Sequence, residues 1–256
     1  MLGDIFGRPG REIVQDVLPQ MDIQYNPDVI IANGENAAGG FGLTKQVAAE
    51  LFKMGVHVIT SGNHIWDKKE IYAYLDEEPR ILRPANYPPE VPGNYLYYVK
   101  VRDQELAIIN LIGRVFMGEY DCPFRTLNDI LDEVRTRTTN IVVDFHAEAT
   151  SEKQALAWYA AGRVSGVVGT HTHVPTSDQR ILPGGTAFTT DLGMCGPLNG
   201  ILGVERDPVI TKFLNQLPTR FSVAKGPTQF CGVIFDIDKS GKAQKIFRIY
   251  HEKNIM

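Results

Sequence analysis

Five short motifs in this sequence contain residue types that bind metals. They are GD (3–4), NGEN (33–36), GNH (62–64), DFH (144–146) and GTHTH (169–173), and each lies at the end of a predicted strand. Loops just beyond strand ends are where α/β sheets assemble their sites, so we expect the five motifs to surround one cavity. The candidate metal ligands in these motifs are Asp4, Glu35, Asn36, Asn63, His146, His171 and His173.

The spacing within the motifs favours a pair of metal ions. His171 and His173 are two residues apart, which on an extended backbone points both imidazoles to the same face. Glu35 is a candidate bridge, because its two oxygens can each bind one cation and hold two ions roughly 3.5–4 Å apart. Taken alone, Asp4 also fits a helix N-cap and Asn63 a turn residue. The coincidence of five such motifs favours the metal site.

The ligand set contains nitrogen and oxygen but no sulfur. Such a set suits Fe, Mn, Zn or Co better than soft metals or calcium. Two divalent ions together with Asp4, Glu35 and a bridging hydroxide carry a net charge of about +1. That charge favours a phosphodiester monoanion as substrate.

The elements that must position these residues alternate between strands and helices, which predicts an α/β fold. One helix is expected over 44–55 with Thr44 as N-cap, and another over 151–162 with Ser151 as N-cap. Apolar runs typical of buried strands cover residues 29–32, 56–60, 106–111, 140–145 and 165–170.

From about residue 180 the pattern changes to shorter strand-like stretches separated by Gly, Pro and Asp, which predicts a second, mainly antiparallel sheet. These stretches cover 180–191, 220–226, 229–238 and 245–250. The proline-rich segment 77–93 is expected to form a surface loop. The simplest arrangement is a single domain over 1–256 with two facing sheets. Only three residues precede Asp4, so the first strand is either unusually short or begins upstream of Met1.

Composition excludes several classes of protein. The chain has 256 residues, 43% of them hydrophobic, and a formal net charge of −4, which argues against stable nucleic-acid binding. No apolar run approaches the length of a membrane span, and the N-terminus lacks the pattern of a signal peptide. The three widely spaced cysteines indicate neither a disulfide framework nor a thiolate metal site. We therefore expect a cytoplasmic enzyme with a small-molecule substrate.

The motifs resemble those of the calcineurin-like metallophosphoesterases, and more closely those of the bacterial YmdB-type family of di-metal phosphodiesterases. The resemblance extends from Gly3 to about Pro197 and is carried by GDIFGRPGR (3–11), NGENAAGGFG (33–42), GNHIWDKKEI (62–71), DFHAEATSEK (144–153) and GTHTHVPT (169–176). It implies a four-layer αββα sandwich of two mixed sheets flanked by helices. It also implies two transition-metal ions, iron foremost, with manganese or zinc as alternatives.

The resemblance further implies a role for each residue. Asp4, Glu35, Asn36 and His173 correspond to one metal site, and Glu35, Asn63, His146 and His171 to the other. His64 corresponds to the catalytic proton donor. The implied reaction is hydrolysis of 2',3'-cyclic nucleotides, such as 2',3'-cyclic AMP, to 3'-nucleotides by a hydroxide that bridges the metals.

Two alternatives stay open at this point. The same site suits a phosphomonoesterase, or a regulatory metal-binding protein that acts through a partner. Phe6 and Glu35–Asn36 stand where the wider superfamily has a histidine ligand and a GD motif. The sequence also leaves homo-oligomerisation open.

Overall fold

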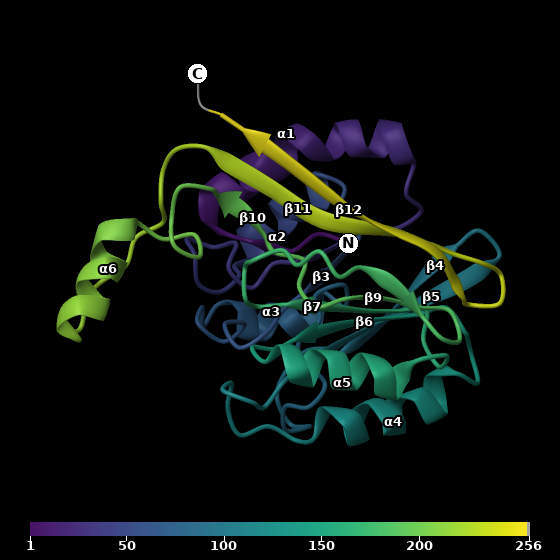
Figure 1. Ribbon diagram of the computed structural model, residues 1–256. Helices are drawn as coiled ribbons and strands as arrows, with labels where there is room; N and C mark the ends of the chain where they lie inside the picture. The colour runs from purple at the N-terminus through teal and green to yellow at the C-terminus, as the bar shows by residue number, and fades with distance from the viewer. Residues whose placement is uncertain (255–256) are drawn as a thin grey trace.

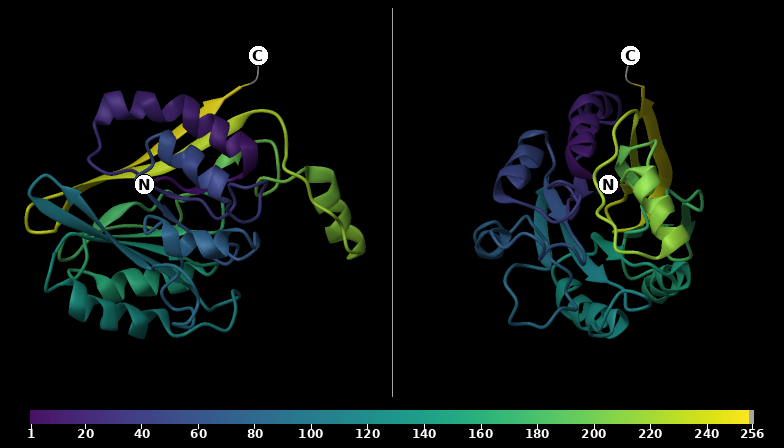
Figure 2. Two further views of the ribbon diagram at one scale, coloured as in Figure 1. Left: turned by 180° about the vertical axis from the view of Figure 1, so that it is seen from behind. Right: turned by 90° about the vertical axis from the view of Figure 1, so that its left-hand side faces the viewer.

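Two β-sheets lie face to face, with helices on both outer sides (Figure 1). The computed structural model describes residues 1–254. Helices α1 (Gly7–Tyr25) and α2 (Lys45–Lys53) cover the first sheet, and α4 (Pro123–Val134) and α5 (Thr150–Ala160) cover the second, as Figure 2 shows from two further sides. The four-layer αββα sandwich expected from the sequence is confirmed.

The first sheet is mixed and consists of two ladders. The four-stranded ladder contains, in spatial order, β1 (Asp4–Ile5), β10 (Met194–Pro197), β11 (Thr228–Ile237) and β12 (Ala243–Lys253). The second ladder is the parallel pair β2 (Ile31–Asn33) and β3 (Val58–Thr60). Leu2 joins the two ladders, because it forms isolated bridges with Ala32 and Gly232.

Strand β1 is short, with only two residues. It pairs in parallel with β10, where Asp4 lies opposite Met194. The backbone N–H of Asp4 donates to the carbonyl of Gly193 at 3.1 Å, and that of Phe6 donates to Cys195 at 2.9 Å. These hydrogen bonds hold the Asp4 side chain at the end of the sheet.

The second sheet has six strands, and its four central strands are parallel. In spatial order they are β4 (Leu96–Val101), β5 (Gln104–Ile112), β6 (Ile141–His146), β7 (Gly166–Thr170), β9 (Thr186–Thr189) and β8 (Arg180–Leu182). The edge strands β4 and β8 are antiparallel to their neighbours. Ile112, His146 and Thr170 share one register position, so the strand ends of β5, β6 and β7 lie level.

Apolar side chains fill the three spaces between the layers. One cluster packs α1 and α2 against the first sheet, and another packs α4 and α5 against the second. The space between the sheets holds buried branched residues that both faces contribute, namely Ile31, Val58, Leu82, Ile108 and Val142. Burial of these side chains fixes how the two sheets face each other.

The predicted N-caps differ in outcome. Helix α2 begins as expected, because the Thr44 side chain accepts a hydrogen bond from the Val47 N–H at 3.2 Å. The prediction for Ser151 is wrong. The N-cap of helix α5 lies two residues earlier, at Ala149, which has the extended conformation and no side-chain cap. Only three residues lie between His146 at the end of β6 and Thr150 at the start of the helix, so Ser151 lies in the first turn.

The assignment of the C-terminal third needs three corrections. Strands β8 and β9 belong to the second sheet, because β9 pairs in parallel with β7. Residues 220–226 form no strand and contribute only an isolated bridge at Val223. The sequence prediction missed helix α6 (Arg206–Asn215), which buries only Val209 and therefore lacks an amphipathic pattern that points inward.

The proline-rich segment 77–93 follows helix α3 (Ile71–Glu77) and is not wholly a surface loop. Ile81 and Leu82 are fully buried, and Ile81 forms a bridge with Ile59 of β3. Their apolar side chains extend the core next to β3. The many prolines of this segment favoured a surface loop in the sequence prediction.

Helix α6 projects from the body of the protein (Figures 1 and 2). Its outward side chains include Phe213 and Leu214, which are 81% and 82% exposed, together with Ile210. Among residues 1–254, the helices are all too short or too polar to cross a membrane.

Candidate metal centre

All seven predicted ligands lie at one edge of the sandwich, where the strands of both sheets end. Asp4, Glu35 and Asn36 belong to or follow β1 and β2 of the first sheet, and Asn63 follows β3. His146 ends β6 of the second sheet, and His171 and His173 follow β7. The site therefore spans the junction between the two sheets.

Four ligand atoms converge around His146, and we call this group the His146 cluster. The Nε2 atom of His146 lies 3.1 Å from Glu35 Oε1, 3.1 Å from Asn63 Oδ1 and 3.0 Å from His171 Nδ1. A metal with bonds of about 2.0–2.2 Å separates its ligand atoms by roughly 2.9–3.5 Å, so these spacings suit one ion. One ligand atom from each of Glu35, His146 and His171 lies within 4.8 Å of the other two, so these three residues could hold an ion together.

The other predicted ligands form the His173 cluster, made of Asp4, Asn36 and His173. The Nε2 atom of His173 lies 3.7 Å from Asp4 Oδ1 and 3.2 Å from Asn36 Nδ2. Among the described residues, the buried Oδ1 of Asp4 has no hydrogen-bond partner. A buried carboxylate oxygen without a partner is costly, and a cation would satisfy it. A half-turn of the Asn36 amide would aim its oxygen at the same point.

Glu35 belongs to both clusters through a single oxygen. Its Oε1 lies 3.1 Å from His146 Nε2 and 3.2 Å from Asn36 Nδ2. Its Oε2 instead accepts a hydrogen bond from the His64 backbone N–H at 3.0 Å. The structure therefore differs from the expected geometry of one oxygen for each ion.

Hydrogen bonds on the far side of each imidazole select the nitrogen that faces the site. The Nδ1 atom of His173 lies 3.0 Å from the carbonyl of Leu202, so it carries the proton and leaves Nε2 free. Likewise, His171 Nε2 lies 3.1 Å from Glu148 Oε2, which leaves Nδ1 facing His146. These contacts give the histidines the tautomers that metal ligation requires.

A buried chain of side chains orients His146. Its Nδ1 lies 3.0 Å from Thr170 Oγ1, and that hydroxyl donates to Asp144 Oδ1 at 2.8 Å. Thr60 donates to the other oxygen of Asp144. Burial raises the pKa of Asp144 to about 7, although both hydroxyl groups oppose this shift.

Charge in the clusters is tightly paired. Burial alone would raise the pKa of Asp4, but contact with His173 and the charge of His173 hold that pKa well below its usual value. Burial alone would lower the pKa of His173, yet Asp4 raises it to about 9. Burial and the neighbouring His146 lower the pKa of His171 to about 3. Asp4 thus favours a second proton on the His173 ring, at Nε2, and a cation bound between the two side chains would displace it.

His64 lies beside the clusters rather than within them. Its backbone contacts Glu35, while its Nδ1 lies 2.8 Å from Asp67 Oδ2 in the turn that follows. That contact leaves Nε2 free, and the side chain is 30% exposed. Asp67 was not among the predicted site residues, although its position three residues after His64 is a usable signal.

A buried ion pair supports the loop that carries His171 and His173. Asp191 lies 2.6 Å from Lys153 Nζ and accepts hydrogen bonds from the Thr172 and Gly193 backbones at 3.1 and 2.8 Å. The backbones of His171 and His173 have φ of 102° and 65°, a region that costs energy for bulky residues. Asp191 therefore holds a strained loop in place.

Gly62 makes room for the His146 ring, and its replacement is expected to weaken metal binding. A Cβ atom at position 62 would lie 2.1 Å from Cδ2 of His146. We expect Gly62→Ala to lower metal affinity by about 10–100-fold, as other changes that misalign a ligand do. Competitive titration with a metal-binding dye measures the affinity. An unchanged affinity in a folded variant would contradict this role for Gly62.

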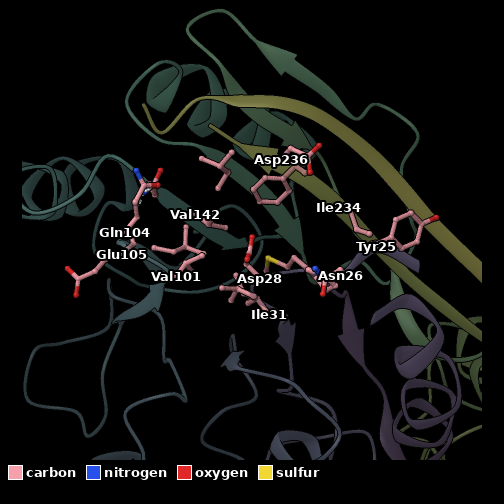
Figure 3. A pocket seen from close by; sticks show the side chains of 17 residues that line it. Tyr25, Asn26, Asp28, Ile31, Val101, Gln104, Glu105, Val142, Ile234 and Asp236 are labelled. Atoms are coloured by element: carbon pink, nitrogen blue, oxygen red, sulfur yellow. Dashed lines mark hydrogen bonds between the residues drawn. The ribbon is translucent and has the colours of Figure 1, made fainter. Parts of the chain in front are cut away.

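A separate cavity of about 260 Å³ lies between the sheets at the opposite end of the strands (Figure 3). Its lining includes Ile31 and Val142, together with Asp28 and Asp236. None of the seven predicted ligands lines this cavity. It is therefore distinct from the candidate metal centre.

The fold is shared with solved structures of a nucleotidase and a phosphatase. The solved structure of the Haemophilus influenzae NAD nucleotidase superposes with a TM-score of 0.60 at 14% identity, covering 94% of this chain and 49% of that one, which shows the shared fold alone. A phosphatase from Mycoplasma pneumoniae superposes with a TM-score of 0.94 at 33% identity, covering 99% of this chain and 92% of that one.

The chain belongs to the YmdB-like protein family, whose model matches residues 1–249. It is 51% identical over 249 residues to the 2',3'-cyclic-nucleotide 2'-phosphodiesterase of Bacillus subtilis. The alignment covers 97% of this chain and 94% of that protein. The family expected from the motifs is thus confirmed.

Proposed function

We propose that this protein is a metal-dependent phosphodiesterase that hydrolyses 2',3'-cyclic nucleotides to 3'-nucleotides. The observation that carries the proposal is the pair of ligand clusters that meet at Glu35 Oε1, with His64 at their edge. The activity named for the Bacillus subtilis relative supports the same substrate class. In this proposal, Asp4, Asn36 and His173 would hold one ion, Asn63, His146 and His171 would hold the other, and Glu35 would contribute to both sites.

Two bound ions would supply positive charge for the phosphoryl oxygens and lower the pKa of a water molecule. The net reaction forms one bond between water oxygen and phosphorus, and it breaks the bond between phosphorus and the 2'-oxygen. His64 donates a proton to the departing 2'-oxygen, because its Nε2 is free and its Nδ1 is held by Asp67. Asp67 is a positioning residue that orients the ring.

Removal of His64 is expected to separate metal binding from turnover. Its side chain contacts neither cluster, so His64→Ala should retain its metals and lose about 10²–10⁴-fold in kcat, the usual contribution of a general acid. Asp67→Asn should show a smaller loss, because the ring keeps its place but loses its charged partner. Metal analysis and steady-state kinetics on both variants test these expectations. Full activity in His64→Ala would overturn the assignment.

The first experiment measures hydrolysis of 2',3'-cyclic AMP by metal-loaded protein, with Asp4→Ala as a control for contaminants. We expect 3'-AMP as the product and no turnover in the variant. Release of phosphate from 3'-AMP without cleavage of the cyclic diester would instead establish a phosphomonoesterase. A protein that holds two metals but hydrolyses neither ester would favour a regulatory metal-binding protein.

We propose iron as the metal in the cell, with manganese or zinc as alternatives; the nitrogen and oxygen ligands suit all three, and the preference for iron rests on the family resemblance. Elemental analysis of protein purified without added metal tests this choice.

The three cysteines are free. This state supports a cytoplasmic location for the single domain that we propose over 1–256.

We also propose that two copies of the chain associate through helix α6. Ile210, Phe213 and Leu214 lie on the helix at three- and four-residue spacing, and all three are exposed. Most homodimers have a two-fold axis, and such an axis would pack this apolar stripe against the same stripe of the second copy. Sedimentation should show a dimer for the wild type and a monomer for Phe213→Ser with Leu214→Ser. A wild-type monomer at micromolar concentration would contradict the proposal.

A further inference from the structure

An aromatic ring lies directly beside the proposed proton donor. The centroid of the Phe41 ring is 5.2 Å from that of the His64 imidazole, with the two planes at 69°. Phe41 is nevertheless 41% exposed, so much of its ring faces open space rather than the core. An apolar ring left open next to a reactive group is well suited to contact substrate.

The backbone that presents Phe41 is built for this position. Gly39, Gly40 and Gly42 all have left-handed φ, between 76° and 95°, which only glycine adopts without strain. A Cβ atom on Gly42 would lie 2.7 Å from Lys68 Cγ and 3.3 Å from Asp67 Cβ. The loop therefore packs closely against the turn that carries His64 and Asp67.

The same loop is tied to the metal ligands. The Gly40 N–H donates to the carbonyl of Asn36 at 3.1 Å, and the Ala38 N–H donates to Gly42 at 3.0 Å. Phe41 lies five positions after Asn36 along this closed turn. The position of the Phe41 ring is thereby fixed relative to both clusters and to His64.

The chemistry of the substrate determines what meets this ring. In a 2',3'-cyclic nucleotide, the base is attached to C1', the carbon next to the one that bears the departing 2'-oxygen. The base must therefore lie next to the group that protonates that oxygen. We propose that Phe41 is the nucleobase platform of this enzyme and selects cyclic phosphates that carry a base. This inference rests on the proposed function and adds a specificity-determining residue to it.

A stacking platform contacts the π-face that every base presents, and Phe41 offers no hydrogen-bonding group for the edges of a base. We therefore expect the 2',3'-cyclic forms of adenosine, guanosine, cytidine and uridine monophosphate to react with kcat/KM values within about tenfold of one another, since stacking is tolerant of base identity.

The test compares two substrates that share the five-membered cyclic phosphate, 2',3'-cyclic AMP and glycerol 1,2-cyclic phosphate, which has no base. Phe41→Ala is expected to lower kcat/KM for the nucleotide by about 10–100-fold, mainly through KM, in line with the contribution of one stacked base. The value for glycerol 1,2-cyclic phosphate should stay within about twofold of wild type. Phe41→Trp should restore the nucleotide value, because it keeps an aromatic face.

Trp158→Ala is the matched control, because Trp158 is another exposed aromatic residue but lies on helix α5. An equal loss on both substrates in Phe41→Ala would overturn the proposal and show that Phe41 only positions His64. An unchanged nucleotide value would overturn it as well. Wild-type protein that hydrolyses neither cyclic phosphate would instead refute the proposed function itself, so the two failures are distinguishable.

Discussion

Glu35→Gln is expected to abolish turnover and to lower the metal content of the protein. Glutamine has the same shape as glutamate but no negative charge, and the substitution changes the one oxygen that both clusters share. We expect activity to fall by at least about 10³-fold, because metal ions contribute several kcal/mol to phosphoryl transfer. Elemental analysis and hydrolysis of 2',3'-cyclic AMP measure the two effects separately.

Glu133→Gln serves as the control, since Glu133 is exposed on helix α4. It removes the same charge from the chain and should change neither quantity. Two bound ions and unimpaired hydrolysis in Glu35→Gln would contradict the shared role of this carboxylate. Circular dichroism establishes that the variant is folded.

Lys153→Met is expected to produce the largest loss of stability. Both side chains of the Lys153–Asp191 pair are only 1% exposed, so the substitution leaves the Asp191 carboxylate buried without its cation. Breaking a buried pair in this way costs about 3–5 kcal/mol. Urea denaturation of the metal-free protein measures this loss as a lower midpoint.

The double variant Lys153→Met with Asp191→Asn should recover part of the lost stability, because it removes the unpaired charge. Asparagine can still accept from the Thr172 or the Gly193 N–H, though not with two carboxylate oxygens. Equal midpoints for the wild type and Lys153→Met would show that Asp191 is satisfied by its backbone contacts alone.

The ligand motifs could be predicted because each combines a local pattern with a topological rule. Buried strands such as β6 and β7 are mainly apolar, and a histidine such as His146 at the end of one is conspicuous. Parallel strands bring their carboxyl ends to one edge of a sheet, which explains how His146 and His171 meet. No local pattern, however, indicates which nitrogen of a histidine faces the site, because partners such as Leu202 are distant in sequence.

The errors in the fold have a similar cause. Strands β8 and β9 have the short, turn-bounded pattern of an antiparallel sheet, but β9 pairs with β7, and a strand's partner is not encoded within the strand itself. Asp191 was missed as a support for the site, although it follows β9 just as the other site residues follow their strands. The strand-end rule that identified the ligands would therefore also have identified this residue.

The ligands of the His146 cluster come from both sheets, which has a consequence for the choice of metal. Glu35 and Asn63 belong to one sheet and His146 and His171 to the other, while Ile31, Val58 and Val142 fill the space between them. The distance between the ligands of the two sheets is thus set by the thickness of the apolar core that separates the sheets. Substitutions that thin or thicken this layer would change which ionic radius the site prefers, without altering a single ligand.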